Sequence, residues 1–248
     1  MEKVSIITPS FNSKKYFLET YKSVVAQTYE NFEWIIVDDC SSDGSYEFIK
    51  NLIKDDSRVK LQKLDRNSGT AKARNLGLKC SSGRFVTFLD ADDMIDKNYL
   101  ENQVNFMVNN GPIISSGYRR ITGKSTTNFY VPPNVSYKDL LKTCSLSCLT
   151  TMYDKQIIGD CFFPENMKKA EDYPFWLNIL KKGYVAKGNP EVLASYRILE
   201  GSRSRNKLSL ARHIFYVYHT TQSFGFLKSL FFVFRWAFNG LIKYKTVK

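Results

Sequence analysis

The sequence predicts a single α/β domain, with helices flanking a mainly parallel central sheet and a helical appendage at its C-terminal end. Over the first 118 residues, short apolar runs alternate with segments of helical character. Strands alternating with helices of about 10–15 residues are typical of crossover connections in a parallel sheet. The run at residues 34–37, Trp-Ile-Ile-Val, is continuously apolar, which suits a strand covered on both faces. With 248 residues, 43% of them hydrophobic, the chain can bury a core without disulfide or metal support.

The expected elements of the first half follow one another in regular order. Strands are expected at residues 4–8, 32–38, 59–64, 85–89 and 113–118. Helices are expected between them at residues 14–27, 46–54, 69–79 and 97–108. The polar residues 10–13 supply caps for the first of these helices.

The second half is less regular. Residues 122–128 are polar and are predicted to form a mobile loop, and Pro132-Pro133 stops any regular element. Three further elements are expected, namely a helix at residues 139–149, a helix at 171–182 closed by Gly183 and a strand at 192–197. No repeat or linker interrupts the chain, so one domain over residues 1–200, followed by a segment over 201–248, is the simplest organisation.

The net charge of +12 belongs to the end of the chain. Residues 197–248 carry ten Lys or Arg and one acidic residue, whereas residues 1–196 carry 26 basic and 23 acidic residues. The composition excludes collagen-like and disordered classes of protein. Five cysteines without a framework spacing and two distant histidines do not form a zinc motif, so reduced thiols are expected. No signal segment and no run of 18 uncharged apolar residues is found, so the expected compartment is the cytosol.

Candidate chemistry gathers at one predicted edge of the sheet. Ligands of open parallel α/β sheets bind outside the carboxyl ends of the strands, which places residues 9–12, 38–43, 65–69 and 90–93 together. Three of these four clusters carry carboxylates, which repel one another unless positive charge lies among them. A divalent cation with a phosphate ligand resolves this, helped by Lys72 and Arg74. Each cluster taken alone also fits a turn or a helix cap, so the prediction rests on their joint order.

That ordered series resembles the family 2 inverting glycosyltransferases, which have the A-type nucleotide-sugar fold. The matching segments, spread over residues 4–182, are VSIITPSFN at 4–12, SVVAQT at 23–28, IVDDCSSDG at 36–44, NSGTAKARN at 67–75, FLDADD at 88–93 and EDY at 171–173. Cys40 departs from the family, which often has Gly there. The resemblance implies a nucleotide-binding half over residues 1–118 and an acceptor-side half over 119–200.

The resemblance also implies roles for particular residues. Seven residues would bind the nucleotide sugar: Pro9, Asn12, Asp39, Asp65, Arg74, Asp90 and Asp92. Among them, Asp39 would accept the N–H of the base and select uridine. Asp92 or Asp93 would hold Mn²⁺ or Mg²⁺, and the sequence does not choose between them. Asp172 would be the general base, with Glu171 as the competing residue because adjacent helical residues point about 100° apart.

The implied reaction is an inverting transfer of a hexose, glucose or galactose, from a UDP-sugar to a hydroxyl of a polyprenyl-diphosphate-linked saccharide. Such a transfer would serve the synthesis of O-antigen or another bacterial surface polysaccharide. The alternatives are a nucleotidyltransferase that makes nucleotide sugars and a basic nucleic-acid-binding module. The second leaves the ordered carboxylates unexplained, so no nucleic-acid partner is expected.

The C-terminal segment from residue 222 is rich in aromatic residues at helical spacing. Four polar or basic residues form a stripe on the same helix, namely Lys228, Arg235, Asn239 and Lys243. A broad aromatic face with a basic stripe suits a helix lying in an anionic membrane interface. Peripheral attachment to the cytoplasmic face of the inner membrane is therefore expected. The alternative is a helix packed on the core or on another subunit.

Overall fold

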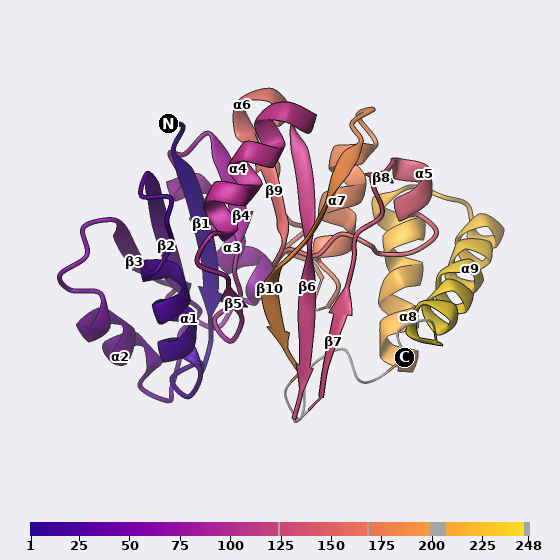
Figure 1. Cartoon of the computed structure of the whole chain (residues 1–248). Coiled ribbons are helices and arrows are strands. Elements are labelled where there is room, and N and C mark those ends of the chain that lie inside the picture. Colours follow the sequence, from indigo (N-terminus) through magenta and orange to yellow (C-terminus); the bar gives the residue numbers. More distant parts are fainter. Residues whose placement is uncertain (124, 168, 199–206, 246–248) are drawn as a thin grey trace.

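A computed structural model describes residues 1–123, 125–167, 169–198 and 207–245 of the chain (Figure 1). Within these residues the strands form one sheet in the order β3-β2-β1-β4-β9-β6-β10-β5, with β7 on β6 and β8 on β10. The strands are β1 (Val4–Ser10), β2 (Phe32–Asp38), β3 (Val59–Lys63), β4 (Phe85–Phe88), β5 (Met94–Ile95), β6 (Ile113–Thr122), β7 (Ser125–Phe129), β8 (Asn134–Val135), β9 (Thr151–Asp154) and β10 (Ala186–Arg197). The helices are α1 (Phe17–Val25), α2 (Ser45–Leu52), α3 (Thr70–Cys80), α4 (Tyr99–Asn110), α5 (Tyr137–Leu140), α6 (Lys155–Ile158), α7 (Asp172–Leu180), α8 (Lys207–Tyr216), a π-helical turn η2 (Val217–Thr221) and α9 (Phe226–Lys245).

The predicted fold class is confirmed. Strand β1 pairs in parallel with both β2 and β4, β2 pairs in parallel with β3, and the long β10 pairs in parallel with β6. The sequence did not reveal β9, a four-residue strand that lies antiparallel between β4 and β6 and joins the two parallel groups. The sheet is therefore mixed, and its longest ladders are parallel.

Helices cover both faces of the sheet because alternate strand residues point to opposite sides. On one face, Ile6, Trp34 and Ile36 pack with residues of α1, α2 and α4, and Trp34 stacks on Phe17 with ring centroids 5.6 Å apart. On the other face, Ile35 and Val37 pack against α3, while Val86 and Phe88 pack with α7 and the C-terminal helices. The continuous apolar run in β2 is thus buried on both sides, as its composition predicts.

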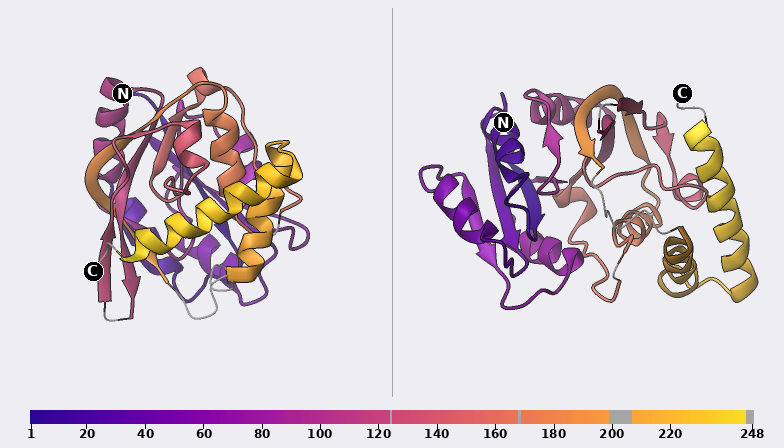
Figure 2. Two further views of the ribbon diagram at one scale, coloured as in Figure 1. Left: turned by 90° about the vertical axis from the view of Figure 1, so that its right-hand side faces the viewer. Right: turned by 90° about the horizontal axis from the view of Figure 1, so that it is seen from below.

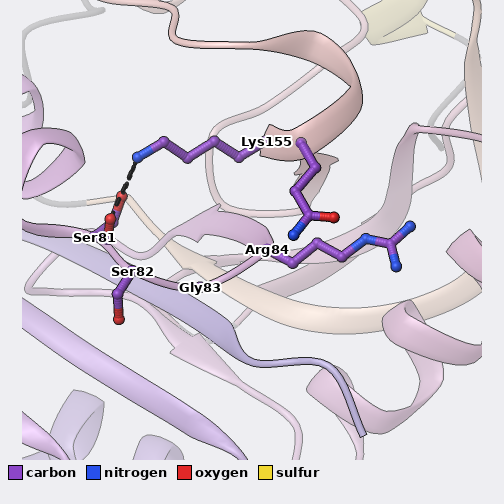
Figure 3. Close-up of a pocket in the computed structure, with 6 residues that line it drawn as sticks. Ser81, Ser82, Gly83, Arg84 and Lys155 are labelled. Carbon is purple, nitrogen blue, oxygen red and sulfur yellow. Dashed lines mark hydrogen bonds between the residues drawn. The ribbon is translucent and has the colours of Figure 1, made fainter.

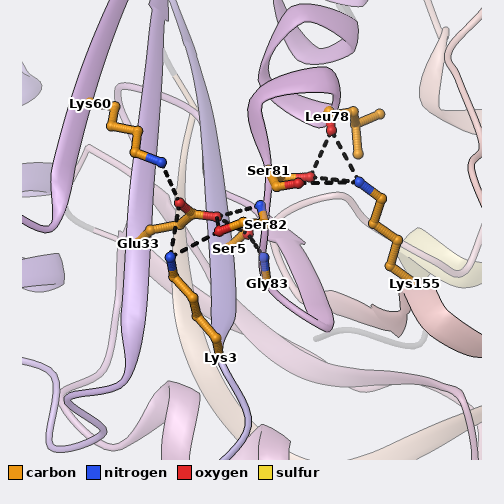
Figure 4. Close-up of polar contacts among 9 residues, drawn as sticks. All are labelled: Lys3, Ser5, Glu33, Lys60, Leu78, Ser81, Ser82, Gly83 and Lys155. Atoms are coloured by element: carbon orange, nitrogen blue, oxygen red, sulfur yellow. Dashed lines mark hydrogen bonds and ion pairs between the residues drawn. The ribbon is translucent and has the colours of Figure 1, made fainter.

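A buried acid ties together the edge of the sheet at which β1 and β4 begin. Glu33 on β2 is buried, and its Oε1 accepts hydrogen bonds from Ser5 Oγ at 2.7 Å and from the Ser82 N–H and Oγ at 2.6 and 2.9 Å (Figure 4). Its Oε2 lies 3.2 Å from Lys3 Nζ and 2.8 Å from Lys60 Nζ. Residue 83 in this cluster is a glycine. A Cβ at this position would lie 2.7 Å from the Ser5 nitrogen, which is too close for any side chain. This cluster has a structural role, far from the carboxyl ends of the strands.

Two predictions of the second half are wrong. The described residues of the 122–128 stretch do not form a loop, because β6 continues to Thr122 and β7 turns back against it. The helix expected at residues 139–149 is only a short one, Tyr137–Leu140. The carbonyls of Leu140 and Leu141 accept hydrogen bonds from the hydroxyls of Tyr173 and Tyr218 at 2.8 Å, and these contacts take the place of further helix hydrogen bonds.

The C-terminal helices form the outermost layer at the end of the molecule opposite α2 (Figure 2). Ile214, Val217 and Tyr218 are buried in the same cluster as α7, and Phe232 and Trp236 of α9 pack against that cluster. The expected boundary at residue 200 lies outside the described residues. So does the side chain of Lys243, a member of the expected stripe. Of the helices in the described part of the chain, none combines the length and the apolar character that crossing a membrane requires.

Candidate active site

The four predicted clusters do share one edge of the sheet. The register aligns Ser10 with Asp38 and Asp38 with Lys63, and it aligns Ile7 with Phe88 two residues before Asp90. The segments that follow β1, β2, β3 and β4 therefore leave the sheet at the same end. This end is the carboxyl rim at which ligands of parallel sheets bind.

The segments after β1 and β2 are held together by hydrogen bonds. Asn12 adopts a positive φ of 50°, its backbone N–H donates to Ser41 Oγ and its Oδ1 accepts from the Ser42 N–H, both at 2.9 Å. Pro9 lies beside Val37 in the ladder. Pro9 and Asn12, both predicted to bind the nucleotide sugar, thus lie at the rim, the first on β1 and the second two residues after it.

Asp39 holds the start of α3. Its two carboxylate oxygens accept hydrogen bonds from the backbone N–H groups of Ser68 at 2.7 Å and Gly69 at 2.8 Å. A carboxylate has about four acceptor positions, so Asp39 retains capacity for a further donor. Cys40 has a φ of 60°, a left-handed conformation that explains why glycine fits this position. Asp65 is exposed, and its carbonyl accepts the thiol of Cys40 at 3.7 Å.

Arg74 joins two acids from distant parts of the chain. Its buried guanidinium lies 2.7 Å from Asp90 Oδ1 through Nη2 and 3.0 Å from Glu171 Oε1 through Nη1. The same guanidinium lies 5.3 Å from the centre of the Phe163 ring. Among the described residues, Nε of Arg74 has no hydrogen-bond partner. Arg74 thus draws the start of α7 to the end of β4.

Asp172 begins α7 next to this ion pair. The pKa of Asp172 is raised, mainly by burial and secondly by the negative charge of Glu171. The charge of Arg74 and the N–H of Tyr173 oppose this rise. A carboxylate with a raised pKa at a site of this kind can accept a proton during a reaction. Glu171 is engaged by Arg74, so the two adjacent acids have different surroundings.

Asp92 and Asp93 are a second pair of adjacent acids with different surroundings. Burial, followed by the charge of Asp90, raises the pKa of Asp92 to about 6. Asp93 is buried, its Oδ1 accepts the backbone N–H of Arg197 at 2.9 Å, and burial raises its pKa well above the ordinary value. Asp93 therefore anchors the end of β10, while Asp92 is partly exposed at the rim.

The acids at the rim can supply only part of the ligands that a divalent cation requires. No three His, Cys, Asp or Glu side chains gather into a metal-binding group within the part of the chain that the structure describes. Mg²⁺ and Mn²⁺ accept one or two carboxylates and complete their shell with phosphate oxygens and water. The carboxylate of Asp92, partly exposed at the rim, fits such an ion when a diphosphate supplies the remaining ligands, whereas that of Asp93 is buried and holds the N–H of Arg197.

Three residues of the site were not singled out from the sequence. Arg197 ion-pairs with Glu19 at 2.7 Å and supplies the N–H that holds Asp93. Tyr196 precedes it, and Cys148 is buried near Arg74. An aromatic residue followed by a charged one at the end of a late strand was the available signal for Tyr196 and Arg197, but only the fold brings β10 to the rim.

A cavity of about 230 Å³ lies away from the rim (Figure 3). It is lined by Ser81, Ser82, Gly83, Arg84, Lys155 and Gln156. Lys155 Nζ donates to the carbonyls of Leu78 and Ser81, and Arg84 pairs with Asp154 and Glu2. Lys155 thus binds the end of α3, and Arg84 links β9 to the N-terminal segment. The cavity lies where α3 ends and β4 begins, so it is separate from the candidate site at the carboxyl ends of the strands.

Comparison with known proteins agrees with this geometry. The model of the family described as glycosyl transferase family 2 matches residues 5–163. The Escherichia coli UDP-Glc:alpha-D-GlcNAc-diphosphoundecaprenol beta-1,3-glucosyltransferase WfaP is 37% identical over an alignment of 248 positions, which covers 98% of this chain and 96% of WfaP.

Solved structures share the fold. Staphylococcus aureus TarS 1–349 in complex with UDP-GlcNAc superposes with a TM-score of 0.70 at 24% identity, over 93% of this chain and 70% of that one. The mannosyltransferase PcManGT of Pyrobaculum calidifontis, solved with GDP-Man and Mn²⁺, gives a TM-score of 0.69 at 18% identity, over 93% and 69% of the two chains. The chain belongs to glycosyl transferase family 2 and is a glycosyltransferase.

Proposed function

We propose that this enzyme moves a hexose from a UDP-sugar to a hydroxyl of a polyprenyl-diphosphate-linked saccharide, with inversion at the anomeric carbon. The observation that carries the proposal is the Arg74 guanidinium, which holds Asp90 and Glu171 together and so brings Asp172 to the carboxyl rim. WfaP transfers glucose from UDP-Glc to a diphosphoundecaprenol-linked GlcNAc, and this similarity supports glucose as the donor sugar and a lipid-linked acceptor. The pathway would be the synthesis of O-antigen or another surface polysaccharide.

The donor would lie along the rim from β1 to β4. Pro9 and Asn12 would line the base pocket, and Asp39, which retains acceptor capacity, would receive the base N–H. Asp65 and Arg74 would lie near the base and the phosphates, and Asp90 near the ribose. Arg74 is suited to the vicinity of a diphosphate because its charge is fixed in place by two acids.

Asp172 would act as the general base. An inverting transfer is a single in-line displacement, so it requires no enzyme nucleophile but does require a group to accept the proton of the acceptor hydroxyl. The raised pKa of Asp172 suits that task. Glu171 is the weaker candidate because Arg74 holds its carboxylate in an ion pair.

Asp92 would hold a Mg²⁺ or Mn²⁺ ion, and Asp93 would contribute by keeping β10 against the rim. Such an ion, when bound, neutralises the charge that develops on the departing diphosphate. The other roles would fall to residues of this chain. Asp90 and Arg74 would lie at the rim beside that diphosphate, and Asp172 would lie on the acceptor side. Mn²⁺ in the PcManGT structure supports a divalent ion in this fold.

Helix α9 would attach the enzyme to an anionic membrane from the cytoplasmic side. Its outward stripe consists of Leu227, Phe231, Phe234 and Phe238, all exposed. Lys228 and Arg235 are exposed beside that stripe, and basic side chains favour anionic lipid headgroups. Because the opposite side of α9 packs on the core, attachment would be peripheral.

The test uses the purified enzyme with a synthetic lipid-diphosphate GlcNAc acceptor and separate UDP-glucose, UDP-galactose and UDP-N-acetylglucosamine donors. We expect release of UDP and a β-linked product from an α-linked donor, read from the anomeric NMR signal. A nucleotidyltransferase would instead release pyrophosphate from UTP and a sugar 1-phosphate. That result, or an α-linked product, would refute the proposal.

A further inference from the structure

The helix that carries Asp172 is braced by the C-terminal segment. Tyr173, the residue after Asp172, is buried in the first turn of α7. Its hydroxyl lies 2.7 Å from the hydroxyl of Tyr218 and 2.8 Å from the carbonyl of Leu140. Tyr218 donates its own hydroxyl proton to the carbonyl of Leu141 at 2.8 Å. The proton of Tyr173 is then directed to Tyr218 or Leu140, so the hydrogen-bond chain is complete without an unsatisfied group.

A second contact holds α7 farther along. Gln222 is buried, and its side-chain nitrogen donates to Asn178 Oδ1 at 2.9 Å. The carbonyl oxygen of the same side chain accepts the hydroxyl of Tyr137 at 2.9 Å. Tyr218 and Gln222 are four residues apart and so lie on one side of their helix. The C-terminal segment therefore contacts α7 both near its start, at Tyr173, and one and a half turns later, at Asn178.

The local backbone supports these contacts. Tyr218 lies in the π-helical turn η2, where the N–H of Gln222 donates to the carbonyl of Val217 at 3.0 Å. Single π-helical turns are uncommon in proteins, but those that occur are often found at functional sites. The ring of Tyr218 is also packed between Tyr173 and Phe232 of α9, with centroid distances of 6.0 and 5.4 Å. Tyr218 is thus fixed from both sides.

We infer that Tyr218 and Gln222 are positioning residues that hold α7, and with it Asp172, in the place where a base can meet the acceptor hydroxyl. The inference rests on the proposed role of Asp172. Within the part of the chain that the structure describes, neither side chain forms a hydrogen bond with the carboxyl rim from β1 to β4, so their effect should fall on the chemical step and not on donor binding. Tyr218 and Gln222 would then give the C-terminal segment a role in the reaction besides the proposed membrane attachment.

The test compares Tyr218→Phe with Tyr216→Phe in the full chain, using a water-soluble acceptor. Tyr216 is a matched control because its hydroxyl accepts a hydrogen bond from Asn166 at 2.7 Å. Among the residues that the structure describes, this hydroxyl forms no hydrogen bond to α7. We expect Tyr218→Phe to lower kcat about tenfold or more, since small displacements of a catalytic group are costly, with KM for the UDP-sugar unchanged. Tyr216→Phe should change neither constant. Equal kcat in the two variants, or a rise in KM without a fall in kcat, overturns the inference.

Two further variants guard against misinterpretation. Should Tyr218→Phe fail to fold, Gln222→Ala removes the side-chain hydrogen bonds to Asn178, Tyr137 and Thr221 and leaves Tyr218 in place, and an unchanged kcat in that variant overturns the inference. Asp172→Asn separates the two proposals. If Asp172→Asn is active, the proposed base is wrong, whereas an inactive Asp172→Asn beside a fully active Tyr218→Phe refutes the positioning role alone.

Discussion

Nη1 of Arg74 lies 3.0 Å from Oε1 of Glu171, and this ion pair distinguishes two acids that are adjacent in the sequence. The guanidinium is 5% exposed and Glu171 is 13% exposed, so the pair is largely shielded from water. Glu171 is therefore held as a partner of a buried cation, and Asp172 is the acid that we propose as the general base. The finding decides which of the two carboxylates we expect to be essential.

Asp172→Asn should lower kcat by about 10²- to 10⁴-fold, the usual contribution of a general base, while the affinity for UDP stays near that of the wild type. The carboxamide keeps the shape of the side chain but cannot accept the proton. Single-substrate kinetics and calorimetric titration with UDP measure the two quantities.

Glu171→Gln is the matched control. It should weaken donor binding and lower stability, because Arg74 loses a charged partner, but it should retain turnover. The opposite pattern, with Glu171→Gln inactive and Asp172→Asn active, would show that the two roles are exchanged.

The pH dependence of kcat should report the same carboxylate. Burial and the charge of Glu171 raise the pKa of Asp172, so its base form is lost at a higher pH than the value of about 3.9 for a free Asp. The rate should therefore fall as the pH is lowered from neutrality through that raised pKa. Glu171→Gln removes the neighbouring negative charge and should move this acid limb to lower pH. A limb that stays in place in Glu171→Gln would argue against Asp172 as the titrating group.

Much of the rim was predictable because it depends on local sequence. Strand and helix periods place residues such as Asp38 and Asp90 at strand ends, and parallel pairing then gathers them at one edge. The Arg74–Glu171 ion pair was not predictable from spacing, because its partners are 97 residues apart and meet only once α7 packs near α3. The same holds for the Arg197 N–H that binds Asp93 across 104 residues.

The C-terminal helix shows a second limit of sequence patterns. Its apolar residues surround much of the helix, so periodicity alone could not divide them between core and solvent. The fold makes that division, because Phe232 and Trp236 pack on the cluster that contains Tyr218. Asn239, expected on a basic outer stripe, instead donates to the carbonyl of Lys142 at 3.0 Å. One side of α9 therefore packs on the core, and the prediction of membrane attachment concerns only the opposite side.

Activity should depend on a divalent cation. Chelation should abolish transfer, and added Mn²⁺ or Mg²⁺ should restore it, because the departing diphosphate requires compensation of charge. Asp92→Ala should reduce both kcat and the ion-dependent affinity for UDP, measured by titration with and without Mn²⁺. Full turnover in excess chelator would contradict the proposal.

Asp93→Ala tests the separate role of the neighbouring acid. It leaves the buried N–H of Arg197 without its acceptor, so the free energy of unfolding should fall by about 1–3 kcal/mol. Denaturant unfolding measures this loss. Asp92→Ala, whose side chain is partly exposed, should unfold much like the wild type, and an equal loss in both variants would show that the two residues do not differ as described.

Glu33→Ala should lower the free energy of unfolding by about 2–3 kcal/mol at pH 7, because the buried hydroxyl of Ser5 and the N–H and hydroxyl of Ser82 lose their acceptor. Burial alone would raise the pKa of Glu33, but hydrogen bonds from Lys60, Ser82 and Ser5 outweigh burial and lower it. The stabilisation is therefore complete above the unfolded-state pKa of about 4.3 and declines as the pH falls below it. Urea unfolding at neutral and acidic pH should show the difference between wild type and variant shrinking in acid, and a constant difference would contradict this account.

Phe231→Asp combined with Phe234→Asp should release the enzyme from anionic phosphatidylglycerol vesicles. The two side chains are 57% and 73% exposed on α9, so the change removes outward apolar area and leaves the inward face intact. Burial of such area in a membrane contributes roughly 25 cal/mol per Å², and each nearby Lys or Arg adds about 1 kcal/mol on an anionic surface. Co-sedimentation of the wild type should weaken in high salt, because the contribution of Lys228 and Arg235 is screened while the apolar contribution persists.

The matched control places the same substitutions on other exposed apolar residues, Val108→Asp with Ile157→Asp, which are 70% and 51% exposed on α4 and α6. This control should still sediment with vesicles, because it leaves α9 unchanged. Transfer to a water-soluble acceptor should survive in both double variants, since the carboxyl rim is unaltered and Tyr218 keeps its contact with Tyr173. A Phe231→Asp, Phe234→Asp protein that remains bound to vesicles would exclude the outer stripe as the attachment surface. If that protein lost activity toward the soluble acceptor while remaining folded, the outer stripe would instead act on the site through α9 and the π-helical turn.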